Sequence, residues 1–369
     1  MKQLNLRMYA MVIALVCIWI IFTLLTNGTF LSFRNLFNLS RQAAVIAILS
    51  IGMVFIIISA NIDLSVGFGA GMLGAITAIL HVKENLPIFL TIVIVLCIGI
   101  IIGMLHGFLV AYRRIPAFIV TLGGFLVYRG LMLALTKGET ISLPDNWLKY
   151  IGTAHLPQVL GWILMCVGVG VTGYLFIHQL NNSQLQRTFK SILPIALKYF
   201  AICVSIVAIV VVMNSYRGIP IPACILFGLA FVFHFVSNHT RFGRYIYAVG
   251  GNTNAAYLSG VNVQSITLRV FAIMGALMSI AGIVMTARLG SAGPGAGRLL
   301  ELDAIAACVI GGASLMGGRG TVFGAILGAF VMASLTNGMS LANMSTAWQD
   351  IVKGVVLVAA VGFDVASRK

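Results

Sequence analysis

Long apolar stretches separated by short polar ones run through the whole chain. A membrane-spanning helix needs about 20 mostly apolar residues, and stretches near this length recur from one end of the sequence to the other. The pattern predicts twelve apolar segments, at residues 8–26, 43–60, 64–81, 87–112, 115–136, 158–179, 192–213, 219–237, 266–288, 302–317, 321–338 and 347–363. The longest linkers, 137–157 and 238–265, are too short to bury an independent core. We therefore expect a single transmembrane domain over residues 1–369.

Two places in this pattern do not fit simple spans. Segments 43–60 and 64–81 are separated by only about three residues around Asp63, and segment 302–317 is short for a tilted span. Irregular backbone at membrane depth is tolerated only inside protein or along a wet cavity. The sequence thus predicts an all-α polytopic integral membrane protein with 10 to 12 transmembrane segments, some of them broken or re-entrant.

Composition and charge agree with a membrane protein. Hydrophobic residues make up 60% of the chain and charged residues 8%, against about 25% charged in soluble domains. The net charge of +15 does not indicate nucleic acid, because Lys and Arg lie singly between apolar runs. Positive residues favour cytoplasmic loops, and this bias places both termini in the cytoplasm. The six cysteines lie inside apolar segments without paired spacing, so we expect neither disulfides nor a metal site.

The sequence contains few features that would indicate an enzyme or a cofactor-binding protein. No GxxxxGK[ST] phosphate-binding loop is present, so we expect no ATP or other cofactor bound by this chain. No Ser, Cys or Lys has a recognisable base nearby, which predicts no catalytic residue and no enzyme. The membrane segments also lack a series of carboxylates for proton relay, and this disfavours an ion-coupled secondary carrier.

Four acidic residues fall where membrane helices begin or enter the bilayer. Asp63 is interpreted either as a cap at a helix break, accepting the free N–H groups of the next first turn, or as an ordinary N-cap at the surface. Glu301 and Asp303 open segment 302–317, where negative charge is favourable. Asp350 and Lys353 are three residues apart, and this spacing predicts an ion pair along one helix face.

Glycines recur at spacings of four residues along several segments. This spacing puts them on one helix stripe, and the main interpretation is close packing against another helix. The second interpretation is that Gly-rich elements 64–75 and 311–320 line or hinge a translocation path. The stripes are Gly99, Gly103 and Gly107; Gly67 and Gly71; and Gly320, Gly324 and Gly328.

The polar loop 238–265 is the strongest local signal. Asn252 or Thr253 can cap a helix of about two turns over 254–259, and Gly260 suits the left-handed position that ends it. So short a helix does not persist alone in water. It therefore docks either on a partner or, in the alternative interpretation, on its own protein as a connector.

Four strings in the sequence resemble a known family. They are SANIDLSVG (59–67), RIPAFIVTLGGFLVYRG (114–130), RFGRYIYAVGGNTNAAYLSGVNV (241–263) and ELDAIAACVIGGASLMGGRGTVFGAILGA (301–329). In composition and order they resemble the membrane subunit of ribose/xylose-type bacterial ABC sugar importers. The region 140–217 and the ending 337–361 are similar to the xylose branch.

The resemblance implies a permease of the bacterial inner membrane that translocates a monosaccharide. The first expected substrate is xylose or a related pentose. Its implied partners are a cytoplasmic ABC ATPase, which uses ATP, a periplasmic sugar-binding protein, and a second permease copy in the bilayer. Residues expected to contact the ATPase from this cytoplasmic coupling loop are Gly250, Gly251, Asn252, Ala255, Ala256, Ser259 and Gly260. Residues expected along the translocation path or its gate are Asp63, Ser65, Gly67, Gly311 and Gly312. The alternative is a related permease for branched-chain amino acids or another small solute.

Overall fold

The computed structural model describes residues 2–144, 147–182 and 189–366, and these are mostly helical. The helices are α1 (Lys2–Leu25), α2 (Phe33–Ile58), α3 (Val66–Ala78), α4 (Ile88–Ala111), α5 (Ala117–Thr136), α6 (Trp147–Thr153), α7 (Gln158–Asn182), α8 (Phe189–Asn214), α9 (Ile221–His239), α10 (Arg241–Gly251), α11 (Thr253–Leu258), α12 (Val263–Leu289), α13 (Leu300–Ile310), α14 (Val322–Leu341) and α15 (Thr346–Ala366). A 3₁₀ turn (Thr29–Leu31), a π turn (Ile79–Lys83) and two paired strands, β1 (Ile141–Ser142) and β2 (Ser291–Ala292), complete the described chain.

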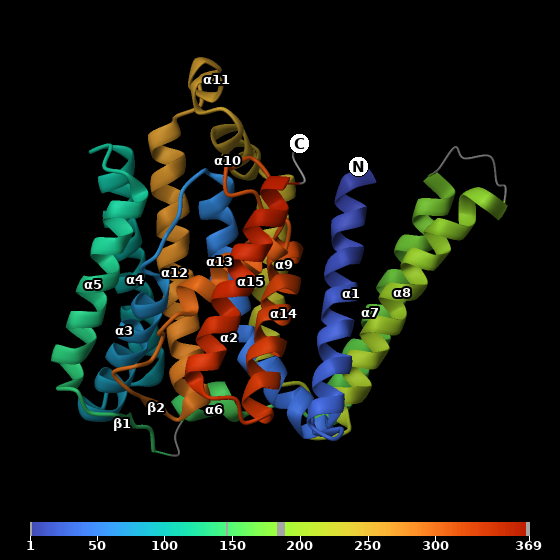
Figure 1. Cartoon of the computed structure of the whole chain (residues 1–369), viewed down its shortest axis with the longest axis horizontal. Coiled ribbons are helices and arrows are strands. Elements are labelled where there is room, and N and C mark those ends of the chain that lie inside the picture. Colours follow the sequence, from blue (N-terminus) through green and yellow to red (C-terminus); the bar gives the residue numbers. More distant parts are fainter. Residues whose placement is uncertain (1, 145–146, 183–188, 367–369) are drawn as a thin grey trace.

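The predicted helical membrane fold is confirmed. In the described chain, 9 helices are long and apolar enough to cross a membrane: α2, α3 with its π turn, α4, α5, α7, α8, α9, α12 and α14. The apolar part of α1, Met11–Leu25, is shorter. Figure 1 shows α1 and α15 running alongside the spans, and the predicted count of 10 to 12 includes both.

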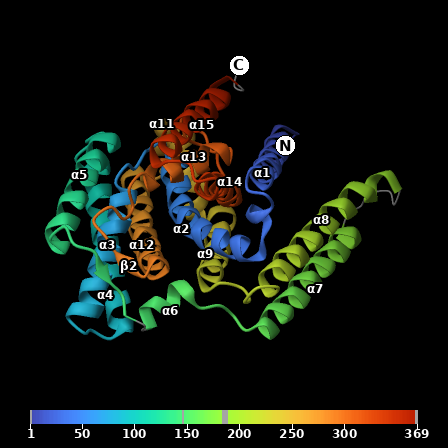
Figure 2. The same ribbon diagram turned by 60° about the horizontal axis from the view of Figure 1, so that its bottom comes forward.

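The centre of the molecule is built around α2 and α12. Both helices are buried over most of their length, and α12 packs against α4, α3 and α2. Helices α4 and α5 cover one side of this pair, while α13, α14 and α15 lie on the other (Figure 1). Helices α7 and α8 form a hairpin that extends away from the rest of the structure (Figure 2). Its attachment is a small separate apolar cluster of Phe37, Val210, Met213, Ile219 and Ala223.

Both predicted breaks are present. The chain leaves the helix after Ile58 and resumes it at Val66, and α13 ends at Ile310, well before the predicted residue 317. The residues from 311 to 321 form turns instead of helix. Figure 1 places α11 at one end of the molecule and α6, β1 and β2 at the other, and we refer to these as the α11 end and the α6 end.

Two elements differ from the sequence prediction. Helix α2 begins at Phe33, about ten residues before the predicted segment, because polar residues near its start lie in the helix although they interrupt the apolar run. Helix α10 was expected to be loop. Its buried residues are Gly243, Ile246, Val249 and Gly250, a helical spacing that makes it a short amphipathic helix lying on the protein.

The glycine stripe of α4 packs directly against α12, as its spacing predicts. A Cβ atom added to Gly103 would collide with the backbone of Phe271 and come within 3.0 Å of the Ala272 Cα. Gly99 and Gly275 exclude side chains from each other's position in the same way. The two helix backbones are therefore close enough that only glycine fits between them.

We expect Gly103→Leu to destabilise the protein by about 1–3 kcal/mol or more, because overpacking forces the two backbones apart. The measurement is thermal unfolding of the purified protein in detergent. Gly170→Leu is the matched control, since Gly170 lies on α7 with no heavy atom within 4 Å of its Cβ position. Equal melting temperatures for the two variants would contradict the packing account.

Candidate functional site

The first part of the site is the break between α2 and α3. Asp63 lies in this break with 1% of its surface exposed. Its Oδ1 accepts a hydrogen bond from the backbone N–H of Ser65 at 2.8 Å and another from the Ser65 hydroxyl at 2.6 Å. An aspartate that bonds the backbone two residues ahead closes a tight turn. Asp63 and Ser65 thus hold the chain between the two helices.

The predicted roles of Asp63 need correction. The surface-cap interpretation is wrong because the side chain is buried. The interpretation as a cap of α3 is also inexact. The carboxylate bonds Ser65, which precedes the helix, and Ser65 itself makes no side-chain cap bond. The turn takes the carboxylate away from the N–H groups of the first helical turn.

The start of α3 meets the start of α13. A Cβ atom on Gly67 would collide with the Glu301 carboxylate and lie 3.1 Å from the Glu301 backbone nitrogen, and Gly67 and Gly297 also exclude side chains from each other. The two elements predicted to be broken therefore pack against each other through their N-terminal ends. Among the predicted path residues, Asp63, Ser65 and Gly67 are brought together here.

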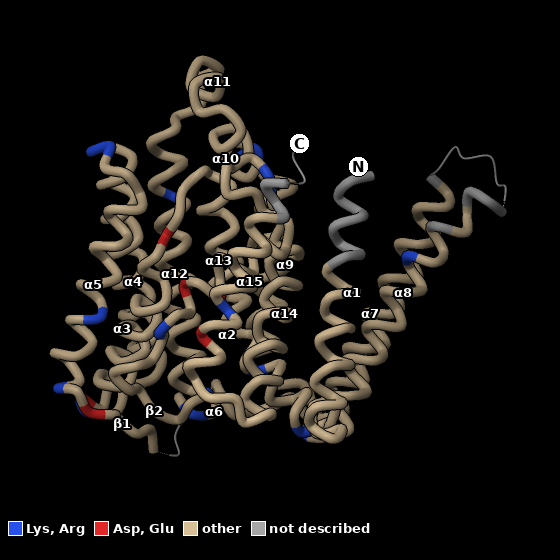
Figure 3. Tube along the Cα trace, viewed as in Figure 1, with Lys and Arg blue, Asp and Glu red and all other residues tan. Residues whose placement is uncertain are grey.

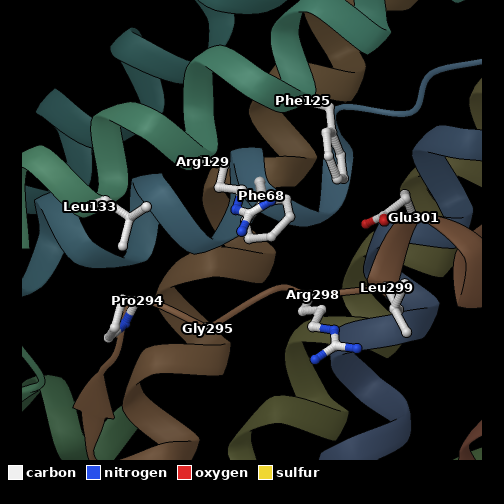
Figure 4. Close-up of a pocket in the computed structure, with 9 residues that line it drawn as sticks. All are labelled: Phe68, Phe125, Arg129, Leu133, Pro294, Gly295, Arg298, Leu299 and Glu301. Atoms are coloured by element: carbon white, nitrogen blue, oxygen red, sulfur yellow. The ribbon is translucent and has the colours of Figure 1, made fainter. Parts of the chain in front are cut away.

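A cavity of about 490 Å³ opens beside this contact. Figure 4 shows Phe68 on α3, Phe125 and Arg129 on α5, and Glu301 on α13 around it. The Phe68 and Phe125 rings pack edge to face with centroids 4.9 Å apart. The full lining is Phe68, Phe125, Arg129, Leu133, Pro294, Gly295, Arg298, Leu299 and Glu301. The sequence analysis assigned none of these residues to a path, and it placed Glu301 only at the start of segment 302–317.

The polar side chains that line the cavity are charged. Arg129 places its guanidinium 5.9 Å from the centre of the Phe68 ring. Arg298 forms an ion pair with Asp350 at 3.1 Å. In the described part of the chain the Glu301 Oε2 is buried and has no hydrogen-bond partner. The cavity therefore combines two aromatic faces with hydrogen-bonding groups of both charges.

A second polar contact, between α4 and α5, was missed by the sequence analysis. The Tyr128 hydroxyl and the His106 Nε2 are 2.7 Å apart, and both side chains are buried. Thr121 on α5 donates to the carbonyl of Ile62 in the break at 3.3 Å. A histidine inside the apolar run 87–112 was the available signal, since ionisable residues at membrane depth are costly. These contacts hold α4 and α5 beside the turn of Asp63.

At the α11 end, the polar loop 238–265 contains two helices, α10 and α11. Asn252 caps α11, its side chain accepting from the Ala255 backbone N–H at 2.9 Å. Gly260 has a φ of 82° and follows the helix, as the left-handed end predicted. The predicted cap, the two-turn helix and its termination are confirmed.

Exposure divides the seven predicted coupling residues. Gly251, Asn252, Ala255, Ser259 and Gly260 are exposed in the described chain, whereas Gly250 is buried and Ala256 is 5% exposed. Gly250 packs against Ile58 and Gly318, and Ala256 faces the protein beneath α11, so neither presents its side to a partner in the described chain. The prominent apolar side chains are instead Tyr257, 67% exposed, and Leu258, 84% exposed.

Gly250 connects this loop to the break described above. A Cβ atom there would collide with the Ile58 carbonyl and lie 2.9 Å from the Gly318 nitrogen. The Gly318 N–H donates to that same Ile58 carbonyl at 2.9 Å, and the Tyr247 hydroxyl of α10 donates to the Gly320 carbonyl at 2.8 Å. The end of α10, the end of α2 and the turns after α13 therefore meet at one point.

Gly311 and Gly312 lie away from Asp63, at the opposite end of α13 from Glu301. Gly311 packs against the Gly324 backbone of α14 so closely that neither accepts a side chain. Gly312 has a φ of 85° and opens the turn that leads toward Gly318. The predicted path residues thus form two groups, one at each end of α13. The described residues contain no group of three or more His, Cys, Asp or Glu placed to hold a metal ion.

Comparison with known proteins identifies the chain's relatives. Residues 35–361 match the family described as branched-chain amino acid transport system / permease component. The chain belongs to this permease family. No solved structure matches it.

Two relatives of this permease are matched from end to end. The chain is 45% identical to the xylose transport system permease protein XylH of Haemophilus influenzae, over 100% of this chain and 99% of that protein. It is 44% identical to XylH of Escherichia coli K12, over 100% of this chain and 94% of that protein. The ribose import permease protein RbsC of Haemophilus influenzae is 37% identical over 91% of this chain and 86% of that protein. The predicted family resemblance is confirmed.

Proposed function

We propose that this chain is the membrane-spanning permease subunit of an ATP-driven ABC importer of the bacterial inner membrane, and that its substrate is xylose or a related pentose. The observation that supports this most is the 44–45% identity along the full length with two xylose permeases. The geometry agrees. A polyol can pack its apolar faces on Phe68 and Phe125 while Arg129 and Glu301 hydrogen-bond its hydroxyls, bonds that are stronger with charged groups.

The α11 end faces the cytoplasm in this proposal. Arg241 and Arg244 open α10 there, and Arg319 lies in the turns that α10 contacts, in keeping with the cytoplasmic preference of basic residues. The first residues of α1 and the last of α15 lie toward the same end (Figure 1). A cytoplasmic ATPase, the subunit that hydrolyses ATP, would contact Tyr257 and Leu258. Movement would then pass through Gly250 to the Ile58 end of the break.

The other partners follow from the same orientation. A periplasmic binding protein would deliver the sugar at the α6 end. A second copy of the permease would pack near α5, where Arg129 and Leu133 are exposed in the single chain although they line the cavity. Such a homodimer would enclose the cavity between two chains. ATP binding shifts the gate only if the ATPase contacts the two permease states differently.

Branched-chain amino acids are the second candidate substrate. The family's description names them, and the cavity has groups of both charges that could match a zwitterion, with Arg129 and Arg298 for the carboxylate and Glu301 for the ammonium. The 44–45% identity to two xylose permeases makes the sugar the first candidate.

Competition for uptake separates these substrates. Cells that carry the complete transporter are given labelled xylose with an excess of unlabelled xylose, ribose or leucine. We expect xylose and, to a lesser extent, ribose to compete, and leucine to have no effect. Accumulation of labelled leucine by the same cells, together with no accumulation of labelled xylose, would replace the sugar with the amino acid.

We expect Phe125→Ala to lower xylose uptake roughly tenfold, because losing one aromatic face removes about 1.5–3 kcal/mol of apolar contact. The measurement is initial uptake rate in cells, normalised to the amount of permease in the membrane. Phe231→Ala is the matched control, since Phe231 on α9 is 74% exposed and lies outside the cavity. Equal uptake by both variants would remove Phe125 from the route.

A further inference from the structure

Three arginines from separate parts of the chain converge at the α6 end. The Arg41 Nε of α2 donates to the Gly152 carbonyl of α6 at 2.8 Å. Gly152 in turn lies so close to the backbone of Ala287 and Arg288, at the end of α12, that no side chain fits. Helix α6 is therefore pressed between the helices that bear Arg41 and Arg288.

Arg217 joins this group through two aromatic rings in edge-to-face contact. The Arg41 guanidinium lies 5.9 Å from the centre of the Phe37 ring, and the Arg217 guanidinium lies 5.3 Å from the centre of the Tyr216 ring. The Phe37 and Tyr216 rings pack edge to face at 5.3 Å. Lys and Arg positions around α6 are marked in Figure 3.

No carboxylate of the described chain pairs with these arginines. The ion pairs between described residues join Arg298 to Asp350 and Lys353 to Asp303, away from this group. The Arg288 Nε is buried, and within the described ranges it has no hydrogen-bond partner. A buried donor without a hydrogen-bond partner is unfavourable. A bound anion would accept a hydrogen bond from the Arg288 Nε and offset the repulsion among the three arginines.

We propose that Arg41, Arg217 and Arg288 form a binding site for the phosphate of an anionic phospholipid headgroup. The guanidinium fork matches phosphate oxygens, and three such groups favour a net negative lipid over a zwitterionic one. The position suits a headgroup, because Arg288 is the next-to-last residue of a spanning helix. Exposed Trp147 and Tyr150 on α6 are of the kind enriched at membrane interfaces.

The neighbouring surface also favours a lipid over a protein as the occupant. Helix α7 begins close to α6 and exposes Val159, Leu160 and Trp162 along the first turns of its span. An acyl chain can lie along this apolar face while its phosphate reaches the arginines. Arg288 is largely covered, so a phosphate entering from the bilayer can reach it more readily than a carboxylate fixed on a docked protein surface.

Native mass spectrometry of the purified chain in detergent tests the site, with phosphatidylglycerol as the probe. We expect Arg288→Gln, Arg41→Gln and Arg217→Gln each to weaken phosphatidylglycerol binding about tenfold, the equivalent of one lost charged contact. Arg34→Gln is the matched control, because Arg34 lies near the start of α2, is exposed and stands outside the group. Arg288→Lys, which keeps the charge, is expected to retain most of the binding.

Thermal unfolding supplies the second readout and separates the sources of phosphate. Phosphatidylglycerol should raise the melting temperature of the wild type but not of Arg288→Gln, and inorganic phosphate should raise neither. Without added lipid, Arg288→Gln should melt no lower than the wild type, since it removes a buried Nε that has no hydrogen-bond partner in the described chain. The proposal would be overturned if Arg217→Gln and Arg41→Gln both bound phosphatidylglycerol as tightly as the wild type. Stabilisation by inorganic phosphate equal to that by the lipid would overturn its lipid source.

Discussion

Replacing Tyr257 and Leu258 together with alanine is expected to lower ATP-dependent xylose uptake at least tenfold while leaving the permease folded and inserted. Both side chains project into solvent from α11, and Leu258 is 84% exposed. Their loss removes no internal packing. It does remove the apolar anchors of the proposed ATPase contact, where residues of this kind cost about 2 kcal/mol or more each, and 1.4 kcal/mol is a factor of ten.

The measurement is uptake in cells together with co-purification of the ATPase on tagged permease. Leu24→Ala is the control, because Leu24 is 74% exposed and belongs to α1, a helix that lies apart from α11 (Figure 1). We expect the double variant to lose the ATPase and the control to keep it. Wild-type uptake and co-purification in the double variant would show that α11 is a connector packed on its own protein, the alternative that the sequence left open.

Lys353→Met is expected to destabilise the protein by about 3–5 kcal/mol, because it leaves the buried Asp303 carboxylate without its partner. The Lys353 Nζ lies 2.9 Å from the Asp303 Oδ2, and the two side chains are only 16% and 3% exposed. This pair fastens α15 to the start of α13. Thermal or denaturant unfolding in detergent measures the effect.

Two further variants separate this effect from general damage. Asp303→Asn combined with Lys353→Met should recover much of the stability, since it removes both charges. Arg298→Gln breaks an ion pair that is 68% and 39% exposed and should cost less than about 1 kcal/mol. If Lys353→Met were as mild as Arg298→Gln, the buried pair would contribute little to the fold.

That pairing also shows where sequence reasoning reached its limit. The predicted partners Asp350 and Lys353 share one helix, but Lys353 instead reaches Asp303 on α13 and Asp350 reaches Arg298. Spacing along a helix shows which side chains can meet, whereas tertiary packing decides which do. The same limit applies to the cavity, whose lining combines α3, α5 and the segment before α13.

Features set by local chemistry were predictable. The apolar runs predicted the spans, and the Asn252 cap and Gly260 predicted α11. Glycine spacing predicted that α4 packs closely on another helix, but not that this helix is α12. Helix α10 was not predicted because it is apolar only on its buried side, and the polar residues between the buried ones interrupt the apolar pattern. The orientation of Ala256 was missed because which face of a two-turn helix is buried depends on the surface beneath it.

Transport by reconstituted vesicles tests the central claim most directly, namely that this permease is a gate worked by a separate ATPase through α11. Vesicles containing the permease alone, or the permease with its ATPase and binding protein, are given labelled xylose with and without ATP. The account predicts accumulation above the external concentration only with both partners and ATP, and its loss in the Tyr257 and Leu258 double variant. Accumulation by the permease alone, driven by an ion gradient, would contradict it.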